Sequence, residues 1–176
     1  MHIIIDGYNL IRQSDSLRRF ERLGLEKGRE ELIKRLAPYR KLKGHRITVV
    51  FDGWIGGHLR EERQREGGIH IIYSRRGEKA DEVIKRIAGK RSGEELVVVT
   101  SDREIAEAVE RSGGVAIPSP EFETRMILEG EGAVLREKGV SPEEDDDGEI
   151  RRGGKKGPSR RLSKKERLTE RRRRKL

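Results

Sequence analysis

The sequence predicts an α/β fold with a central, mainly parallel sheet, and three observations carry that prediction. Runs of β-branched and other apolar residues alternate with segments of helical periodicity over residues 1 to about 130. These runs are uninterrupted, as expected for parallel strands that are covered on both faces. Turn or helix-capping residues follow each run and separate it from the next helix.

Five strands are expected in chain order. The strand-like runs are residues 2–5, 47–51, 69–73, 96–100 and 115–117. The long connection from Gly53 to Gly68 is polar and rich in charge, which favours a mobile loop or a solvent-exposed helix.

Four helices are expected between and after these strands. They cover residues 25–39, where Pro38 disturbs the pattern, residues 80–88, and residues 102–111 before the stop at Gly113. Ser119 and Pro120 have the sequence of a helix start and predict a last helix after the fifth strand.

Composition excludes several classes of protein. The chain has 176 residues, and 32% of them are hydrophobic and 41% charged. It has no cysteine, which excludes disulfide scaffolds, thiol nucleophiles and thiolate metal sites. No apolar run approaches the roughly 20 residues that cross a bilayer, and the amino terminus does not resemble a signal peptide. We therefore expect a cytoplasmic protein with no membrane partner.

The net charge of +9 is unevenly distributed. Residues 151–176 contain 14 Lys and Arg but only two acids, a net charge of +12, which leaves −3 for the rest of the chain. We expect a folded domain over residues 1–130, an acidic linker over 131–150, and a basic tail over 151–176 that is disordered alone, with residues 162–175 able to become helical against a polyanion. Concentrated Lys and Arg favour nucleic-acid binding over a merely solubilising role. The candidate RNA-binding residues of the tail are Arg151, Arg152, Lys155, Lys156, Arg160 and Arg161.

Carboxylates follow the predicted strands. Three of the runs end in an aspartate, at Asp6, Asp52 and Asp102. Ligands of an open parallel sheet bind beyond the carboxyl ends of its strands, so these side chains are expected at one rim. Asp81, preceded by Glu78, begins a helix near the same rim. Gathered carboxylates repel one another unless a cation neutralises them, and hard oxygen ligands favour Mg²⁺ or Mn²⁺.

Each aspartate also has a purely structural interpretation. An aspartate after a strand commonly caps a helix or forms a turn, and Asp102 has the sequence context of a cap. Spacing alone leaves two possibilities open. One is a set of capping residues, and the other is a two-ion centre that activates a water and stabilises a leaving oxygen.

Aromatic and histidine residues offer weaker signals. Tyr8 and Trp54 lie next to the expected rim and are candidates for stacking an unpaired base, although Trp54 also fits a residue that covers the sheet edge. The four histidines show no metal-ligand spacing and are expected at the surface or packed on strands. They are His2, His45, His58 and His70.

The local motifs resemble a known family. Residues 3–10, IIIDGYNL, are similar to the opening strand and turn of the NYN domain, a branch of the PIN-like nuclease superfamily, and especially to its YacP-like bacterial members. Residues 50–53 (VFDG), 78–81 (EKAD) and 99–102 (VTSD) follow in the family's order. The resemblance covers about residues 1 to 130 and leaves out the basic tail.

This resemblance implies a PIN-like three-layer α/β/α sandwich and a divalent-metal-dependent ribonuclease. It implies metal binding by Asp6, Asp81 and Asp102. Asn9 matches a polar residue that orients Asp6 or touches a phosphate, and Glu78 matches an additional or neighbouring acid.

Two further acidic positions belong to the motif or lie next to it. Asp52 matches the family's Phe-Asp-Gly element and is a structural or a metal-binding candidate. Related members carry an aspartate two positions after the one that matches Asp102, where this chain has Glu104.

The expected function is a Mg²⁺- or Mn²⁺-dependent endoribonuclease that acts on RNA, with the ribosome as a possible partner. The main alternative is a catalytically silent RNA- or ribosome-binding protein that uses the basic tail. A receiver-like phosphoacceptor domain ranks lower, because it needs a lysine at a later strand end, where this chain has Pro118 and Ser119.

Overall fold

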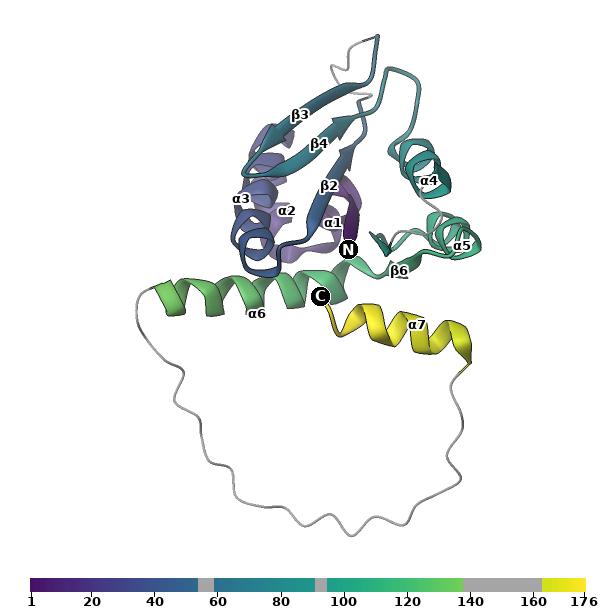
Figure 1. The fold of residues 1–176 in the computed structure, drawn as a ribbon. Helices are drawn as coiled ribbons and strands as arrows, with labels where there is room; N and C mark the ends of the chain where they lie inside the picture. The colour runs from purple at the N-terminus through teal and green to yellow at the C-terminus, as the bar shows by residue number, and fades with distance from the viewer. Residues whose placement is uncertain (54–58, 91–94, 138–162) are drawn as a thin grey trace, which may run out of the picture.

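Six strands form one sheet in the order β3-β4-β2-β1-β5-β6 (Figure 1). The structure is a computed structural model that describes residues 1–53, 59–90, 95–137 and 163–176. The strands are β1 (His2–Asp6), β2 (Arg46–Phe51), β3 (Glu62–Glu66), β4 (Ile69–Tyr73), β5 (Leu96–Val99) and β6 (Val115–Ile117). The helices are α1 (Gly7–Gln13), α2 (Asp15–Leu23), α3 (Leu25–Lys43), α4 (Ala80–Lys90), α5 (Arg103–Arg111), α6 (Ser119–Glu137) and α7 (Lys164–Arg173).

The sheet is the middle layer of three. Alternate residues of β1 enter different cores, because successive side chains of a strand point to opposite faces. Ile3 and Ile5 pack with residues of α1, α2, α3 and α6, whereas Ile4 packs with residues of α4 and α5. Figure 1 shows α2 and α3 on one side of the sheet and α4 and α5 on the other. The predicted α/β/α sandwich is confirmed.

Every pair of neighbouring strands is parallel except β3 with β4. This confirms the mainly parallel sheet and all five predicted strands. The connection from Gly53 to Gly68 was expected to be a loop or a helix, and this expectation is wrong for residues 62–66, which form β3. Gly67 and Gly68 have φ of 56° and 80°, as a two-residue hairpin turn requires. Because β3 is an exposed edge strand, it has no apolar pattern that could identify it.

Three helical features differ from the expectations. α3 continues through Pro38 to Lys43 and ends at Gly44 in the left-handed conformation, so the proline does not end it. α1 and α2 were not predicted. They are short helices that begin at side-chain caps, since Asp6 accepts the Asn9 amide and Ser14 accepts the Leu17 amide.

The carboxyl-terminal residues 163–176 are folded against the domain, so the expectation of disorder is wrong for them. Arg172 is buried and donates to two backbone carbonyl oxygens. One belongs to Leu96, the first residue of β5 (3.0 Å), and the other to Gly113, shortly before β6 (3.1 Å). Leu176 is also buried, and its carbonyl oxygen accepts the Tyr39 hydroxyl at 2.9 Å. A basic segment becomes ordered here because one guanidinium satisfies two carbonyl groups and one leucine enters the core.

The expected linker also differs in part. α6 continues to Glu137, so residues 131–137 are helical, whereas residues 138–150 and the tail candidates between 151 and 162 lie outside the described residues. Within the described ranges, no helix combines the length and the apolar character that a bilayer crossing needs.

Candidate functional site: an acidic cleft at the carboxyl ends of the strands

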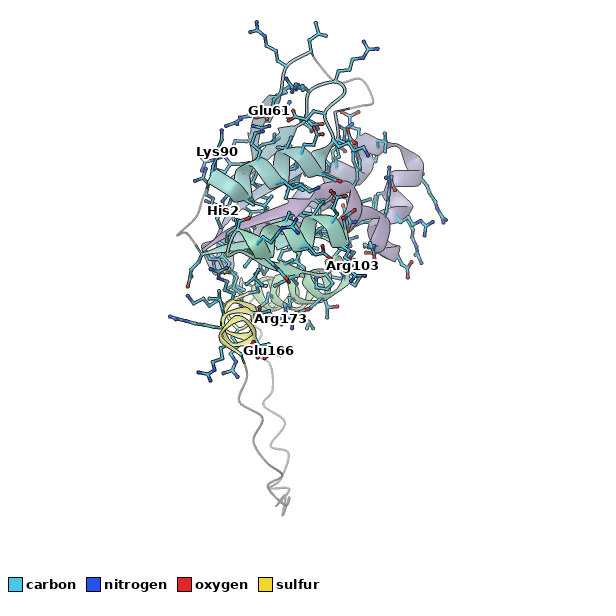
Figure 2. All side chains as sticks on the ribbon, turned by 90° about the vertical axis from the view of Figure 1, so that its right-hand side faces the viewer. His2, Glu61, Lys90, Arg103, Glu166 and Arg173 are labelled. Atoms are coloured by element: carbon cyan, nitrogen blue, oxygen red, sulfur yellow. The ribbon has the colours of Figure 1, made fainter. Side chains whose placement is uncertain are left out.

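β1 is the strand at which the chain order switches from one side of the sheet to the other. From β1 the chain passes to β2 on one side, whereas β5 and β6 lie on the other side. A sheet with such a reversal has a crevice at the carboxyl ends of the two central strands, here β1 and β5. Figure 2 views the molecule from the side on which α4 and α5 cover the sheet.

Asp6 is the last residue of β1 and lies at this crevice. Its carboxylate oxygen Oδ1 accepts the backbone amide of Asn9 at 3.2 Å, which caps α1. The next residue is glycine, Gly7, because a Cβ at this position would lie only 2.3 Å from the Phe51 ring and would not fit. Asp6 is only 8% exposed. Burial, with the nearby charges of Asp81 and Asp102, raises its pKa to about 6 from 3.8.

Asp102 and Asp81 approach Asp6 from two helices. Asp102 precedes α5, and its Oδ1 accepts the amides of Glu104 (2.7 Å) and Ile105 (3.1 Å). Asp81 lies in the first turn of α4, and burial and the charge of Asp102 raise its pKa. Both structural and electrostatic roles are therefore present: Asp6 and Asp102 are helix caps, and all three carboxylates line one cleft.

The cleft has a volume of about 750 Å³ and is lined by both acidic and basic side chains. Its described lining residues are Asp6, Tyr8, Asn9, Arg12, Gln13, Asp15, Arg18, Asp52, Ala80, Asp81 and Asp102. Those that sequence reasoning missed are Arg12, Gln13, Asp15 and Arg18, all on α1 and α2. The sequence signal for these residues is Asp6 as the N-cap of a helix, which predicts that α1 begins directly after β1. A helix that starts at Gly7 places Tyr8 and Arg12 four residues apart on one face, and the Arg12 guanidinium lies 5.3 Å from the centre of the Tyr8 ring.

Asn9 holds three segments of the site together. Its side-chain oxygen Oδ1 accepts the amide of Ser101 at 3.0 Å and the hydroxyl of Ser119 at 2.8 Å. Ser119 is fully buried at the start of α6. Asn9 therefore fixes the loop that carries Asp102 to the helix that follows Asp6, which is a positioning role.

Two further candidates line the cleft. Tyr8 packs edge-on against Phe51, with ring centres 5.2 Å apart, and remains partly accessible from the cleft. Asp52 follows β2, and its Oδ1 lies 3.5 Å from the hydroxyl of Ser74. The structure thus brings Tyr8, Asn9 and Asp52 together with the three central aspartates.

Two acids of the motif point elsewhere. Glu78 is buried, but it pairs with Arg75 (3.3 Å) and Arg86 (3.4 Å) and is not among the lining residues of the cleft. Glu104 is exposed and pairs with Lys85. Their geometry favours structural ion pairs. Trp54 lies outside the described residues, as do the tail candidates.

The acids of the cleft fit a divalent cation in kind. The cleft offers three carboxylates, Asp6, Asp81 and Asp102, and carboxylate oxygens are the donors that Mg²⁺ or Mn²⁺ prefers. Burial and the neighbouring carboxylates raise the pKa of Asp6 and of Asp81, a cost that a bound cation would relieve. As the side chains stand, no three His, Cys, Asp or Glu residues of the described ranges are arranged closely enough to hold one metal ion. Asp6 and Asp102 each direct one oxygen to helix amides instead.

Comparison with solved structures supports the fold. The chain is similar to the crystal structure of Rae1 (YacP) from Bacillus subtilis, with a TM-score of 0.69 and 25% identity over 80% of this chain and 81% of that one. A crystal structure of a mutant of the same Bacillus subtilis protein gives a TM-score of 0.64 at 23% identity over 81% of this chain and 85% of that one. The nuclease-like α/β fold expected from the sequence is thus shared with solved YacP structures.

Sequence comparison agrees. An uncharacterized protein named YacP from Bacillus subtilis (strain 168) is 33% identical over 86 residues, which are 49% of this chain and 50% of that protein. The aligned part therefore spans about half of that relative. A model of the YacP-like NYN domain matches residues 3–173, and so extends beyond residue 130 into the helix α7. The chain belongs to the YacP-like NYN domain family.

Proposed function

We propose that the protein is a Mg²⁺- or Mn²⁺-dependent endoribonuclease that hydrolyses phosphodiester bonds in the acidic cleft. The observation that carries the proposal is the convergence of Asp6, Asp81 and Asp102, which come from three separate elements and line one cleft, where burial and the neighbouring carboxylates raise the pKa of Asp6 and of Asp81. Helix capping explains the positions of Asp6 and Asp102, but it does not explain why a third carboxylate, Asp81, lies beside them, whereas a cation bound between the three would relieve their repulsion.

We assign the residues of the cleft separate roles in metal binding and in substrate binding. A divalent ion bound there would supply a water of lowered pKa and positive charge for the leaving oxygen. Asp6, Asp81 and Asp102 are the residues that would hold it, with Asp52 at the edge of the same cleft. Arg12 and Arg18 line the same cleft as these acids, and their guanidinium groups would bind phosphate oxygens of the substrate. Tyr8 offers a ring face for an unpaired base.

The substrate proposed is single-stranded RNA, as in mRNA or rRNA at the ribosome. A negatively charged cleft excludes a phosphate unless cations bridge the two, and the basic residues from Arg151 onward supply salt-dependent attraction outside the cleft. This attraction positions RNA without reading its sequence.

A cleavage assay tests the proposal. Purified full-length protein with Mg²⁺ or Mn²⁺ should shorten a labelled single-stranded RNA, and EDTA should stop the reaction. Asp6→Asn and Asp102→Asn should each lower the rate at least about 100-fold, since asparagine keeps the helix cap but removes the charge. Glu107→Gln removes a charge from α5 outside the cleft and should leave the rate unchanged.

Two outcomes contradict the proposal. Full activity of both aspartate variants would remove the assigned metal ligands. RNA that is retarded in a gel but never shortened, at any metal concentration, would indicate the alternative of a silent RNA-binding protein.

A further inference from the structure

A second polar region lies on the same face of the sheet, at its opposite end. The middle of this face is apolar and packs against α4 and α5 through Ile4, Val50 and Val98. Toward the amino ends of the strands, the same face carries His2 on β1 and Thr48 on β2. Both side chains are buried, and His2 Nε2 lies 2.8 Å from the Thr48 hydroxyl. A buried polar pair in a covered sheet needs an explanation beyond packing.

These residues form one wall of a cavity of about 530 Å³. His70 of β4 and Arg46 of β2 extend the wall, and the carboxyl-terminal half of α4 contributes Arg86 and Lys90. The cavity shares no described lining residue with the acidic cleft. In Figure 2, His2 and Lys90 are labelled on one side of the layer, and Arg103, the first residue of α5, on the other.

The cavity is cationic. Its described lining contains two Arg and one Lys beside the sheet and α4, a further Arg from β3, two His, and no carboxylate. Arg86 is held in place by Glu61 (2.5 Å) and Glu78 (3.4 Å), which offset part of its charge. Arg46 and Lys90 are exposed and form no ion pair with a carboxylate of the described residues. Two cations at the mouth are thus available to an anionic ligand.

We propose that this cavity binds the phosphate group of a nucleotide, with Arg46 and Lys90 as its charged contacts and the His2–Thr48 pair as its polar floor. Arginine and lysine side chains are the usual partners of phosphate oxygens, and hydroxyl and imidazole groups add hydrogen bonds. The volume is in the range of sites for small ligands, and isoleucines of β4 and α4 line the remaining wall beside the base and sugar.

α4 connects this cavity to the proposed catalytic cleft. Asp81 lies in its first turn and Lys90 is its last residue, which separates them by about 14 Å along the helix at 1.5 Å per residue. The phosphate can therefore belong to a free nucleotide or to a nucleotide of a bound RNA. The two sources share the same contacts and differ only in what extends from the cavity.

Calorimetric titration of the full-length protein in EDTA tests the proposal without depending on cleavage. The probes are inorganic phosphate, 5′-AMP and a pentaribonucleotide that lacks terminal phosphates. The double variant Arg46→Gln/Lys90→Gln removes two exposed cations, and its thermal midpoint checks that it folds. Lys27→Gln/Lys34→Gln removes two exposed cations of α3 and is the matched control. Because the titration measures binding in EDTA, without a divalent ion and without cleavage, a failure of the nuclease proposal leaves this test intact.

The expected result is binding of at least one nucleotide probe that weakens tenfold or more in the cavity variant and not in the control. Tighter binding of 5′-AMP than of the pentamer identifies a free nucleotide as the source, and the reverse order identifies RNA. The proposal is overturned if the wild type binds none of the three probes, or if the cavity and control variants lose the same affinity, which would indicate only a long-range charge effect.

Discussion

The two ends of one sheet face carry opposite charges although they share the same strands. β1 places His2 at its amino end, Ile4 in its middle and Asp6 at its carboxyl end, all on the side of α4 and α5. The acidic cleft lies at one end and the cationic cavity at the other. The apolar middle holds the helix that spans both.

The two ends of the sheet differ in which partners surround their buried polar and charged side chains. At the amino ends, the buried polar groups of His2 and Thr48 bond each other, and Arg172 satisfies two backbone carbonyls. At the carboxyl ends, Asp6 is buried beside two further carboxylates. The first end therefore gains polar contacts, although Arg172 Nε is buried without a hydrogen-bond partner among the described residues. The second end gathers like charges, as is common at sites of chemistry.

The largest expected effect is a gain of stability from Asp6→Asn. The Asp6 pKa is about 6 in the folded protein, above 3.8 for the unfolded chain, so folding favours the protonated form. Its contribution is full below pH 3.8 and is lost as the pH rises through 6. At pH 7 the charged group costs up to about 3 kcal/mol, which the neutral variant recovers.

Urea unfolding between pH 4 and pH 7.5 measures this effect. The gap in stability between the Asp6→Asn variant and the wild type should widen with rising pH. Glu107→Gln, on an exposed part of α5, should show no such gap. Parallel pH profiles for Asp6→Asn and the wild type would contradict a raised pKa at Asp6.

Asn9→Ala sharpens the view of how the acidic end is positioned. The substitution leaves the Ser101 amide and the buried Ser119 hydroxyl without their acceptor, so the loop that carries Asp102 loses its anchor. Cleavage should fall about 10- to 100-fold, with Asn9→Asp restoring part of it because a carboxylate also accepts both bonds. A merely structural role would lower the thermal midpoint and leave the rate of the folded protein unchanged.

Arg172→Ala tests the polar contacts at the amino ends of the strands. The variant leaves the carbonyl oxygens of Leu96 and Gly113 without their donor and opens a gap behind α7. We expect a loss of about 2 kcal/mol in the free energy of unfolding, with little change in cleavage. Arg171→Ala, the exposed neighbour, is the control and should change stability by less than about 0.5 kcal/mol. Equal effects of the two variants would show that α7 does not dock through Arg172.

The smallest expected effect is that of Thr48→Val. The substitution removes the hydroxyl that lies 2.8 Å from His2 Nε2, at a cost of about 1 kcal/mol. Thermal unfolding measures the cost. A stability equal to that of the wild type would mean that the polar floor contributes nothing to the fold, and cleavage should be unaffected in either case.

Local sequence determined most of the framework. The apolar runs identified β1, β2, β4, β5 and β6, because buried parallel strands must be continuously hydrophobic. The aspartates after three of those strands marked the rim that holds the acidic cleft, since parallel strands align their carboxyl ends. No such rule identifies β3, which is polar on both faces and becomes a strand only by pairing with β4.

The remaining features depended on tertiary contacts. Arg12 and Arg18 enter the cleft only because α1 and α2 fold back over the end of β1, and Glu78 leaves it because Arg75 and Arg86 neutralise it elsewhere. Likewise, the charge of residues 163–176 predicts disorder, yet Arg172 and Leu176 find carbonyl groups and apolar surface that the rest of the chain supplies. Periodicity and composition are local properties, whereas the partner of a charged side chain is chosen by the folded structure.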